Sequence, residues 1–78
     1  MKITGKTWHY GWHRVHVEAE TVKEAIPKIV AEFATCGGLP KFVAKFSVSI
    51  NTCEVATVDF KGLHLRRGAK AAFPLFFT

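Results

Sequence analysis

The residues best suited to do chemistry stand together in residues 8–16, Trp-His-Tyr-Gly-Trp-His-Arg-Val-His. Aromatic side chains beside basic ones can stack on nucleic-acid bases while Arg14 and Lys6 hold phosphates. The aromatics alternate along the chain, however, as residues of a buried core also do, which favours a core position for at least one of Trp8 and Trp12. Stacking on bases and filling the core therefore both stay open for this segment.

Three histidines of this region, His9, His13 and His16, raise the question of a Zn²⁺ or Ni²⁺ site, because imidazole is a common ligand of both ions. On a strand, His13 and His16 would point to opposite faces. No cysteine, aspartate or glutamate precedes Glu18 to complete a set of ligands. We therefore expect no bound metal and no other cofactor.

The chain also lacks the patterns that catalysis requires. It contains no Ser-His-Asp spacing of a hydrolase, no phosphate-binding glycine loop before a helix and no HExxH motif. Cys36 falls at the end of a predicted helix, which is a poor position for a nucleophilic thiol. Cys53 stands beside a predicted turn, and two reduced cysteines indicate a cytoplasmic protein. The sequence predicts that the protein is not an enzyme.

Alternating apolar residues and turn residues predict the strands that position these side chains. Gly11 marks a hairpin turn, since the alternation changes parity across it. Asn51 and Thr52 form a second turn, and residues 59–62, Asp-Phe-Lys-Gly, form a third. The expected strands cover residues 2–9, 13–19, 42–50, 53–60 and 63–66, and a short edge strand is expected in residues 71–77.

One helix is predicted at residues 22–35. Thr21 and Glu24 fit a capping box, in which the threonine hydroxyl accepts from the Glu24 amide and the glutamate side chain returns to the Thr21 amide. Apolar residues then recur along one helical face. Pro27 interrupts the hydrogen-bond pattern, so a kink or a looser first turn is expected there.

The element order β-β-α-β-β-β and its short links predict an α+β two-layer sandwich, with one helix on one face of a mostly antiparallel sheet of four or five strands. Residues 1–78 form a single domain in this prediction. Because 49% of the residues are hydrophobic, the chain is not a disordered basic tail. No apolar run is long enough for a transmembrane helix, and residues 1–6 do not fit a signal peptide.

Positive charge is concentrated at both ends of the chain, and the formal net charge is +5. Residues 1–17 and 61–78 contain seven lysines and arginines and no acid, whereas all six acids lie between them. With a single helix, one sheet face stays uncovered, and strand parity makes this face cationic and hydroxylated. The residues expected on it are Arg14, His16, Val43, Lys45, Ser47, Ser49, Val55, Thr57, His64 and Arg66. Such a face suits a polyanion or an acidic protein patch, although an ordinary solvated sheet face has a similar composition.

The strongest candidate for phosphate contacts is the segment 63–70, in which Arg66, Arg67 and Lys70 stand without an acid. A basic edge strand that resists edge-to-edge association would have the same composition. The apolar tail that follows contains Phe76. It is expected either to close the core as a strand or to bind a second subunit or another partner.

Two functions from different classes remain after these exclusions. The first is a non-enzymatic binding module that docks a basic surface on nucleic acid or a nucleoprotein complex. Its expected contact residues are Arg14, His16, Lys45, His64, Arg66, Arg67 and Lys70. The alternative is a protein-binding inhibitor or adaptor, such as a phage- or plasmid-encoded anti-CRISPR-type inhibitor of a host machine, with Trp8, Trp12 and Phe76 as hot spots. A homodimer through the apolar tail is compatible with either function, and no membrane contact is expected.

Overall fold

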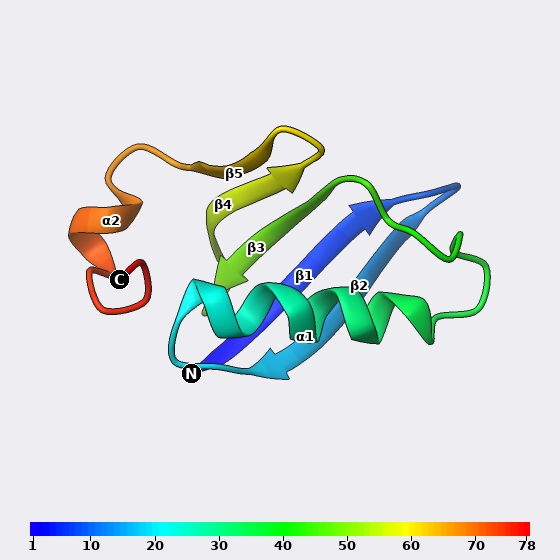
Figure 1. The fold of residues 1–78 in the computed structure, drawn as a ribbon, viewed down its shortest axis with the longest axis horizontal. Coiled ribbons are helices and arrows are strands. Elements are labelled where there is room, and N and C mark those ends of the chain that lie inside the picture. The colour runs from blue at the N-terminus through cyan, green and yellow to red at the C-terminus, as the bar shows by residue number, and fades with distance from the viewer.

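Five antiparallel strands form one sheet, and one long helix crosses one of its faces (Figure 1). This arrangement is seen in a computed structural model that describes residues 1–78. The elements are β1 (Lys2–Trp8), β2 (Trp12–Glu18), α1 (Val22–Ala34), β3 (Phe46–Ile50), β4 (Cys53–Asp59), β5 (Gly62–Leu65) and α2 (Ala69–Ala72). The sheet order is β2-β1-β3-β4-β5. The predicted α+β two-layer sandwich is therefore confirmed, with a short second helix in addition.

The antiparallel register gathers several turns at one end of the sheet. Trp8 pairs with Trp12 at the tip of the β1–β2 hairpin, and Asp59 pairs with Gly62 at the β4–β5 turn. Because Lys6 pairs with a residue near the start of β3, the segment that leads into β3 lies at this same end. We call it the hairpin end, defined by residues 8–12, 39–46 and 59–62. The N-terminus and the residues after β5 lie at the opposite end.

Helix α1 begins at a threonine cap, as predicted. The Thr21 hydroxyl accepts a hydrogen bond from the Glu24 amide at 3.3 Å. The Glu24 carboxylate does not return to the Thr21 amide; it accepts from the Glu20 amide at 3.5 Å and pairs with Lys28 at 3.0 Å. The helix continues through Pro27 to Ala34. Neither helix combines the length and the apolar character needed to cross a membrane.

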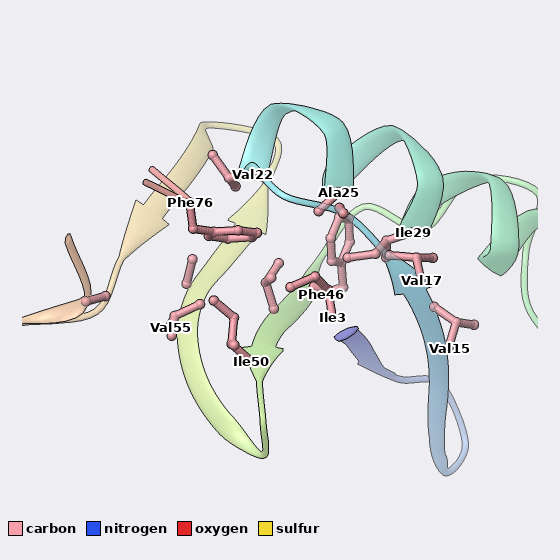
Figure 2. Packing of buried hydrophobic residues seen from close by; sticks show 14 of the residues in the cluster. Ile3, Val15, Val17, Val22, Ala25, Ile29, Phe46, Ile50, Val55 and Phe76 are labelled. Carbon is pink, nitrogen blue, oxygen red and sulfur yellow. The ribbon is translucent and has the colours of Figure 1, made fainter. Parts of the chain in front are cut away.

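The core lies between α1 and the sheet, where apolar side chains from both layers meet (Figure 2). The helix contributes Val22, Ala25, Ile29 and Phe33, all of them buried. Gly5 of β1 lies directly beneath the helix, and a Cβ atom placed there would come within 2.4 Å of Ile29 Cγ2. The absence of a side chain at this position therefore sets how closely helix and sheet approach.

Strand β3 begins at Phe46, four residues later than predicted. Strand β1 ends at Trp8 and β4 at Asp59, so residues 42–44 extend past both neighbours and have no strand to pair with. They form a loop instead. Val43 packs against the core rather than lying on the open sheet face, while Phe42 is 73% exposed.

Strand β4 contains an irregularity that corrects the predicted position of Val55. The β3–β4 register shifts between Val48 and Ser49, so that one residue of β4 has no direct partner. Val55 is this extra residue, and it is 1% exposed within the core instead of lying on the open face. Thr57 keeps its predicted parity, because it lies on the other side of the bulge and pairs with Ser47.

The tail does not form the predicted edge strand. Gly68, with a φ of 82°, starts the short helix α2, and turns follow it to the C-terminus. The backbone still closes on the core, because the Phe76 carbonyl accepts from the Val22 amide at 2.7 Å. Phe76 itself is 1% exposed and belongs to the core cluster (Figure 2). The side chain expected to be a hot spot is therefore unavailable to a partner in this fold.

Candidate functional site

The sheet face opposite α1 carries polar and charged side chains along all five strands. Cross-strand partners share a face, so the register defines the members of this surface. We call it the open face. Its paired residues are Trp8 with Trp12, Lys6 with Arg14, Thr4 with His16, Lys6 with Ser47, Thr4 with Ser49, Ser47 with Thr57, Ser49 with Glu54, and Thr57 with His64. The predicted positions of Arg14, His16, Ser47, Ser49, Thr57 and His64 agree with this register.

Three cations of the open face form no ion pair. Lys6 and Arg14 lie directly opposite each other on β1 and β2, and neither has an acidic neighbour within ion-pair distance. Lys45 precedes β3 and lines the same hollow as Lys6. Like charges on opposed strand positions repel each other. The three residues therefore make a local concentration of positive charge that no group of the protein neutralises.

The basic side chains expected near β5 have acidic partners. Arg66 Nη1 donates to Glu54 Oε2, and His64 Nε2 lies 3.0 Å from Asp59 Oδ1. The hydrogen bond to His64, together with one from the Lys61 amide, lowers the pKa of the Asp59 carboxyl below its usual value. Arg66 and His64 are on the expected side of the molecule, but their acidic partners leave these side chains less free to bind an anionic ligand.

Arg67 and Lys70 lie outside the open face. Both follow β5 at the opposite end of the sheet from the hairpin end, and Lys70 is an exposed residue of α2. Arg67 lines a separate shallow hollow beside α2. Neither residue forms an ion pair. Their predicted part in binding would therefore need a second surface, distinct from the one that holds Arg14 and Lys45.

Trp8 and Trp12 are both exposed, at 63% and 56%, so the expectation that one of them fills the core was wrong. They share the face of Lys6 and Arg14 and close the hairpin as an edge-to-face pair, with ring centroids 5.1 Å apart and an interplanar angle of 74°. Lys6 Nζ lies 4.6 Å from the Trp12 ring centroid. The hairpin thus presents indole rings and ammonium groups side by side.

A hollow of about 460 Å³ opens on this face beside the tryptophan pair. The residues that line it are Lys6, Thr7, Trp8, Trp12, Lys45, Phe46, Ser47, Glu54 and Thr57. The indoles stand on the β1–β2 side, while Glu54 and Thr57 belong to β4. Glu54 is a site residue that sequence reasoning did not select, and Lys6 was named with Arg14 as a phosphate contact but was not placed on the open face. The signal for both positions was cross-strand pairing, which needs the register and not only the parity.

More exposed aromatics stand at the hairpin end. Tyr10 is 94% exposed, Phe42 73% and Phe60 85%. Trp8 and Phe42 also line a second, smaller hollow of about 270 Å³ together with Leu39 and Pro40. One end of the molecule thus carries all of its exposed aromatic side chains.

The histidines near the hairpin form separate hydrogen bonds and do not converge. His13 Nε2 lies 3.1 Å from the His9 carbonyl oxygen, and His16 Nδ1 lies 3.0 Å from the Thr4 hydroxyl. No group of three or more histidine, cysteine, aspartate or glutamate side chains is arranged to hold a metal ion.

Comparison with known proteins adds no relative to these observations. The chain matches no protein-family model, and no curated protein or solved structure shows significant similarity to it.

Proposed function

We propose that this protein is a non-enzymatic binding module that docks its open face on nucleic acid, either free or within a nucleoprotein complex. The observation that carries the proposal is the group of three unneutralised cations, Lys6, Arg14 and Lys45, on a sheet face that no second layer covers. The unpaired thiols of Cys36 and Cys53 support a reducing compartment, such as the cytoplasm, as the place of action.

Electrostatics gives this arrangement a preference for phosphate. Lys6 and Arg14 repel each other across the β1–β2 pair, and a phosphate that contacts both cations replaces this repulsion by two attractions. Each phosphate that binds also releases condensed counterions from the nucleic acid. The gain is available at Lys6 and Arg14 but much smaller at Arg66, where Glu54 already occupies the guanidinium.

Hydroxyl groups extend the same surface across the sheet. Thr4, Ser47, Ser49 and Thr57 are half-buried residues of three adjacent strands on the open face. Hydroxyl side chains commonly contact phosphate and sugar oxygens without reading the sequence. A nucleic acid that lies across β2, β1, β3 and β4 would therefore contact both the cations and these hydroxyl groups.

A protein-binding inhibitor or adaptor, of which an anti-CRISPR-type inhibitor is one example, is the second candidate. It is favoured by the exposed aromatics of the hairpin end, above all Tyr10 and Phe42, and by the apolar hollow beside Phe42. Aromatic side chains are enriched among the residues that dominate protein–protein affinity. In this case the cations would steer association and the aromatics would supply most of the affinity.

Direct binding at two salt concentrations tests the first candidate. We expect the protein to bind labelled DNA or RNA at low salt, with a slope of log K against log salt of about −2 to −3 for three phosphate contacts. The variant Lys6→Ala/Arg14→Ala/Lys45→Ala should lose most of the affinity and most of the slope. Lys23→Ala is the control, because Lys23 is an exposed lysine of α1 without an ion pair.

Absence of binding at low salt would contradict the nucleic-acid proposal. If the triple variant and Lys23→Ala lose the same affinity for nucleic acid per charge removed, the proposed role of the open face is contradicted. A pull-down from lysate, with and without nuclease, then separates the two candidates. A partner that persists after nuclease and is lost in Phe42→Ala supports the protein-binding function.

A further inference from the structure

We propose that the Trp8–Trp12 pair and the adjoining hollow form a stacking site for the bases of single-stranded nucleic acid. This inference rests on the proposed function and assigns its ligand class. The observation behind it is that both indoles are more than half exposed, on the same face and beside the same hollow as the unneutralised cations. Single-strand binding proteins combine these two features, an aromatic platform and a positive track.

The geometry of the pair leaves indole surface free for a base. In an edge-to-face pair, one ring directs its edge at its neighbour and keeps its own faces clear of that neighbour. Lys6 Nζ lies over one face of the Trp12 ring, so the surface open to a base is the remaining exposed part of the two indoles. A base can therefore stack without separating Trp8 from Trp12. Lys6 Nζ, 4.6 Å from the Trp12 centroid, is placed to contact the phosphate of a nucleotide stacked at the pair.

The spacing along the strands suits one nucleotide. Lys6 and Arg14 are each two residues from the tryptophan of their own strand, which corresponds to roughly 6.6 Å along the sheet. Long basic side chains reach across such a distance. One nucleotide can thus place its base on an indole and its phosphate at the Lys6–Arg14 pair.

The residues that line the hollow determine how a bound nucleic-acid strand is oriented on the sheet. Its volume of about 460 Å³ lies in the range of small-molecule pockets, so it can admit a single nucleoside. Lys6 and Lys45 attract phosphate, whereas the β4 side of the hollow is lined by Glu54, which is ion-paired with Arg66, and offers phosphate no unpaired cation. Ser47 and Thr57 offer hydroxyls between them for hydrogen bonds with a base edge. The sugar–phosphate backbone of the nucleic acid therefore follows the lysines, and the base points towards β4.

A double helix fits this surface less well. Its bases are already stacked and paired, so they cannot reach the indoles unless the duplex opens. The one long helix cannot serve as a groove reader in compensation, because its exposed residues Glu24, Lys28 and Glu32 are of mixed charge. We therefore expect single strands to bind more tightly than duplexes of equal length.

Intrinsic fluorescence provides a direct test, because Trp8 and Trp12 are the only tryptophans of the chain. The probes are an oligothymidine of about ten nucleotides, which is long enough for a stacking site, a duplex of equal length, and inorganic polyphosphate. We expect oligothymidine to quench the tryptophan fluorescence on binding. Polyphosphate should bind to the cations with little quenching, because it has no base to stack.

Variants then separate stacking from charge. Trp8→Ala or Trp12→Ala should weaken oligothymidine binding about 5- to 150-fold, which is the loss of one stacked base, and should leave the salt slope unchanged. Tyr10→Ala is the matched control, since Tyr10 is an exposed aromatic of the same hairpin that lies outside the pair. If an alanine variant does not fold, Trp8→Phe keeps an aromatic ring, and quenching of the wild-type protein is still decisive.

The outcomes distinguish the two proposals. If neither oligothymidine nor the duplex binds at low salt, the proposed function fails. If nucleic acid binds with the expected salt slope, but without quenching, or equally to single strands and duplexes, the stacking site is overturned while the proposed function stands. Quenching with an unchanged affinity in both tryptophan variants would also overturn it.

Discussion

At the scale of single residues, the charged groups of the open face differ in whether they have a partner of opposite charge. At β4 and β5 the basic side chains have acidic partners, since Arg66, directly after β5, pairs with Glu54 and His64 with Asp59. On β1 and β2 a lysine and an arginine face each other without an acid. A sheet selected only for stability would place opposite charges at such directly paired positions. This contrast within one face is the reason for proposing that Lys6 and Arg14 bind the ligand.

The hydrogen bonds of Asp59, on the β4–β5 side of the open face, predict the sign of a pH dependence of the free energy of unfolding. Because the hydrogen bonds from His64 and from the Lys61 amide lower the pKa of Asp59 in the folded protein, the ionised carboxylate stabilises the fold. This contribution is present above the usual pKa of aspartate, about 3.9, and is lost as the pH falls through the lowered value. Asp59→Asn should therefore reduce the free energy of unfolding near pH 6 but not near pH 2.

Urea denaturation of the wild type and of Asp59→Asn at several pH values checks this expectation. Glu32→Gln is the control, because Glu32 is an exposed carboxylate of α1 that forms no ion pair. A difference between wild type and Asp59→Asn that persists unchanged to pH 2 would show that the ionised carboxylate is not its cause.

At the scale of elements, the contact between α1 and β1 depends on a missing side chain. We expect Gly5→Ala to lower the free energy of unfolding by about 1–3 kcal/mol, because the added Cβ would come within 2.4 Å of Ile29 Cγ2. Gly37→Ala is the matched control, since a Cβ there would meet nothing within 4 Å. Chemical denaturation of both variants measures the difference, and equal stabilities would refute this account of helix–sheet packing.

Elements defined by local patterns were predictable from the sequence. The Thr21 cap and the apolar helical stripe located α1 to within a residue, and alternation located most of β1, β2 and β4. Val55 escaped prediction because a bulge adds one residue and reverses the parity on one side of it. The conformation of the tail was predicted wrongly, because its apolar composition suits a buried loop as well as a strand. Only the fold shows which surface the tail covers.

The candidate site was predictable in part for the same reason. Parity alone placed Arg14, His16, Ser47 and Thr57 on one face. The exposure of Trp8 and Trp12 was missed for another reason. Trp12 has the parity of Arg14 and His16, but it was assigned to the turn, and its aromatic character favoured a core position. The ion pair of Arg66 depends on Glu54, twelve residues earlier, and long-range pairing of this kind requires the sheet register.

At the scale of the whole molecule, the two ends of the sheet differ in how much aromatic surface they expose. The hairpin end exposes Trp8, Tyr10, Trp12, Phe42 and Phe60. At the opposite end the chain covers its own apolar surface, since the tail after α2 returns to the start of α1 (Figure 1). The exposed aromatic side chains of the hairpin end, in a chain that buries others completely, support the proposal that this end binds a partner.

The packing of the tail at the end of the sheet opposite the hairpin end leads to a prediction about the stability of the whole chain. Phe76 is among the largest fully buried side chains, and it joins the C-terminal tail to the start of α1, because its carbonyl accepts from the Val22 amide. Phe76→Ala should lower the free energy of unfolding by about 3–5 kcal/mol. This is a large part of the roughly 4–12 kcal/mol expected for a domain of this size. Leu75→Ala should change it by less than about 0.5 kcal/mol, because Leu75 is 77% exposed. Thermal and chemical denaturation compare the two variants, and a mild effect of Phe76→Ala with a severe effect of Leu75→Ala would mean that the tail docks with its other side against the core.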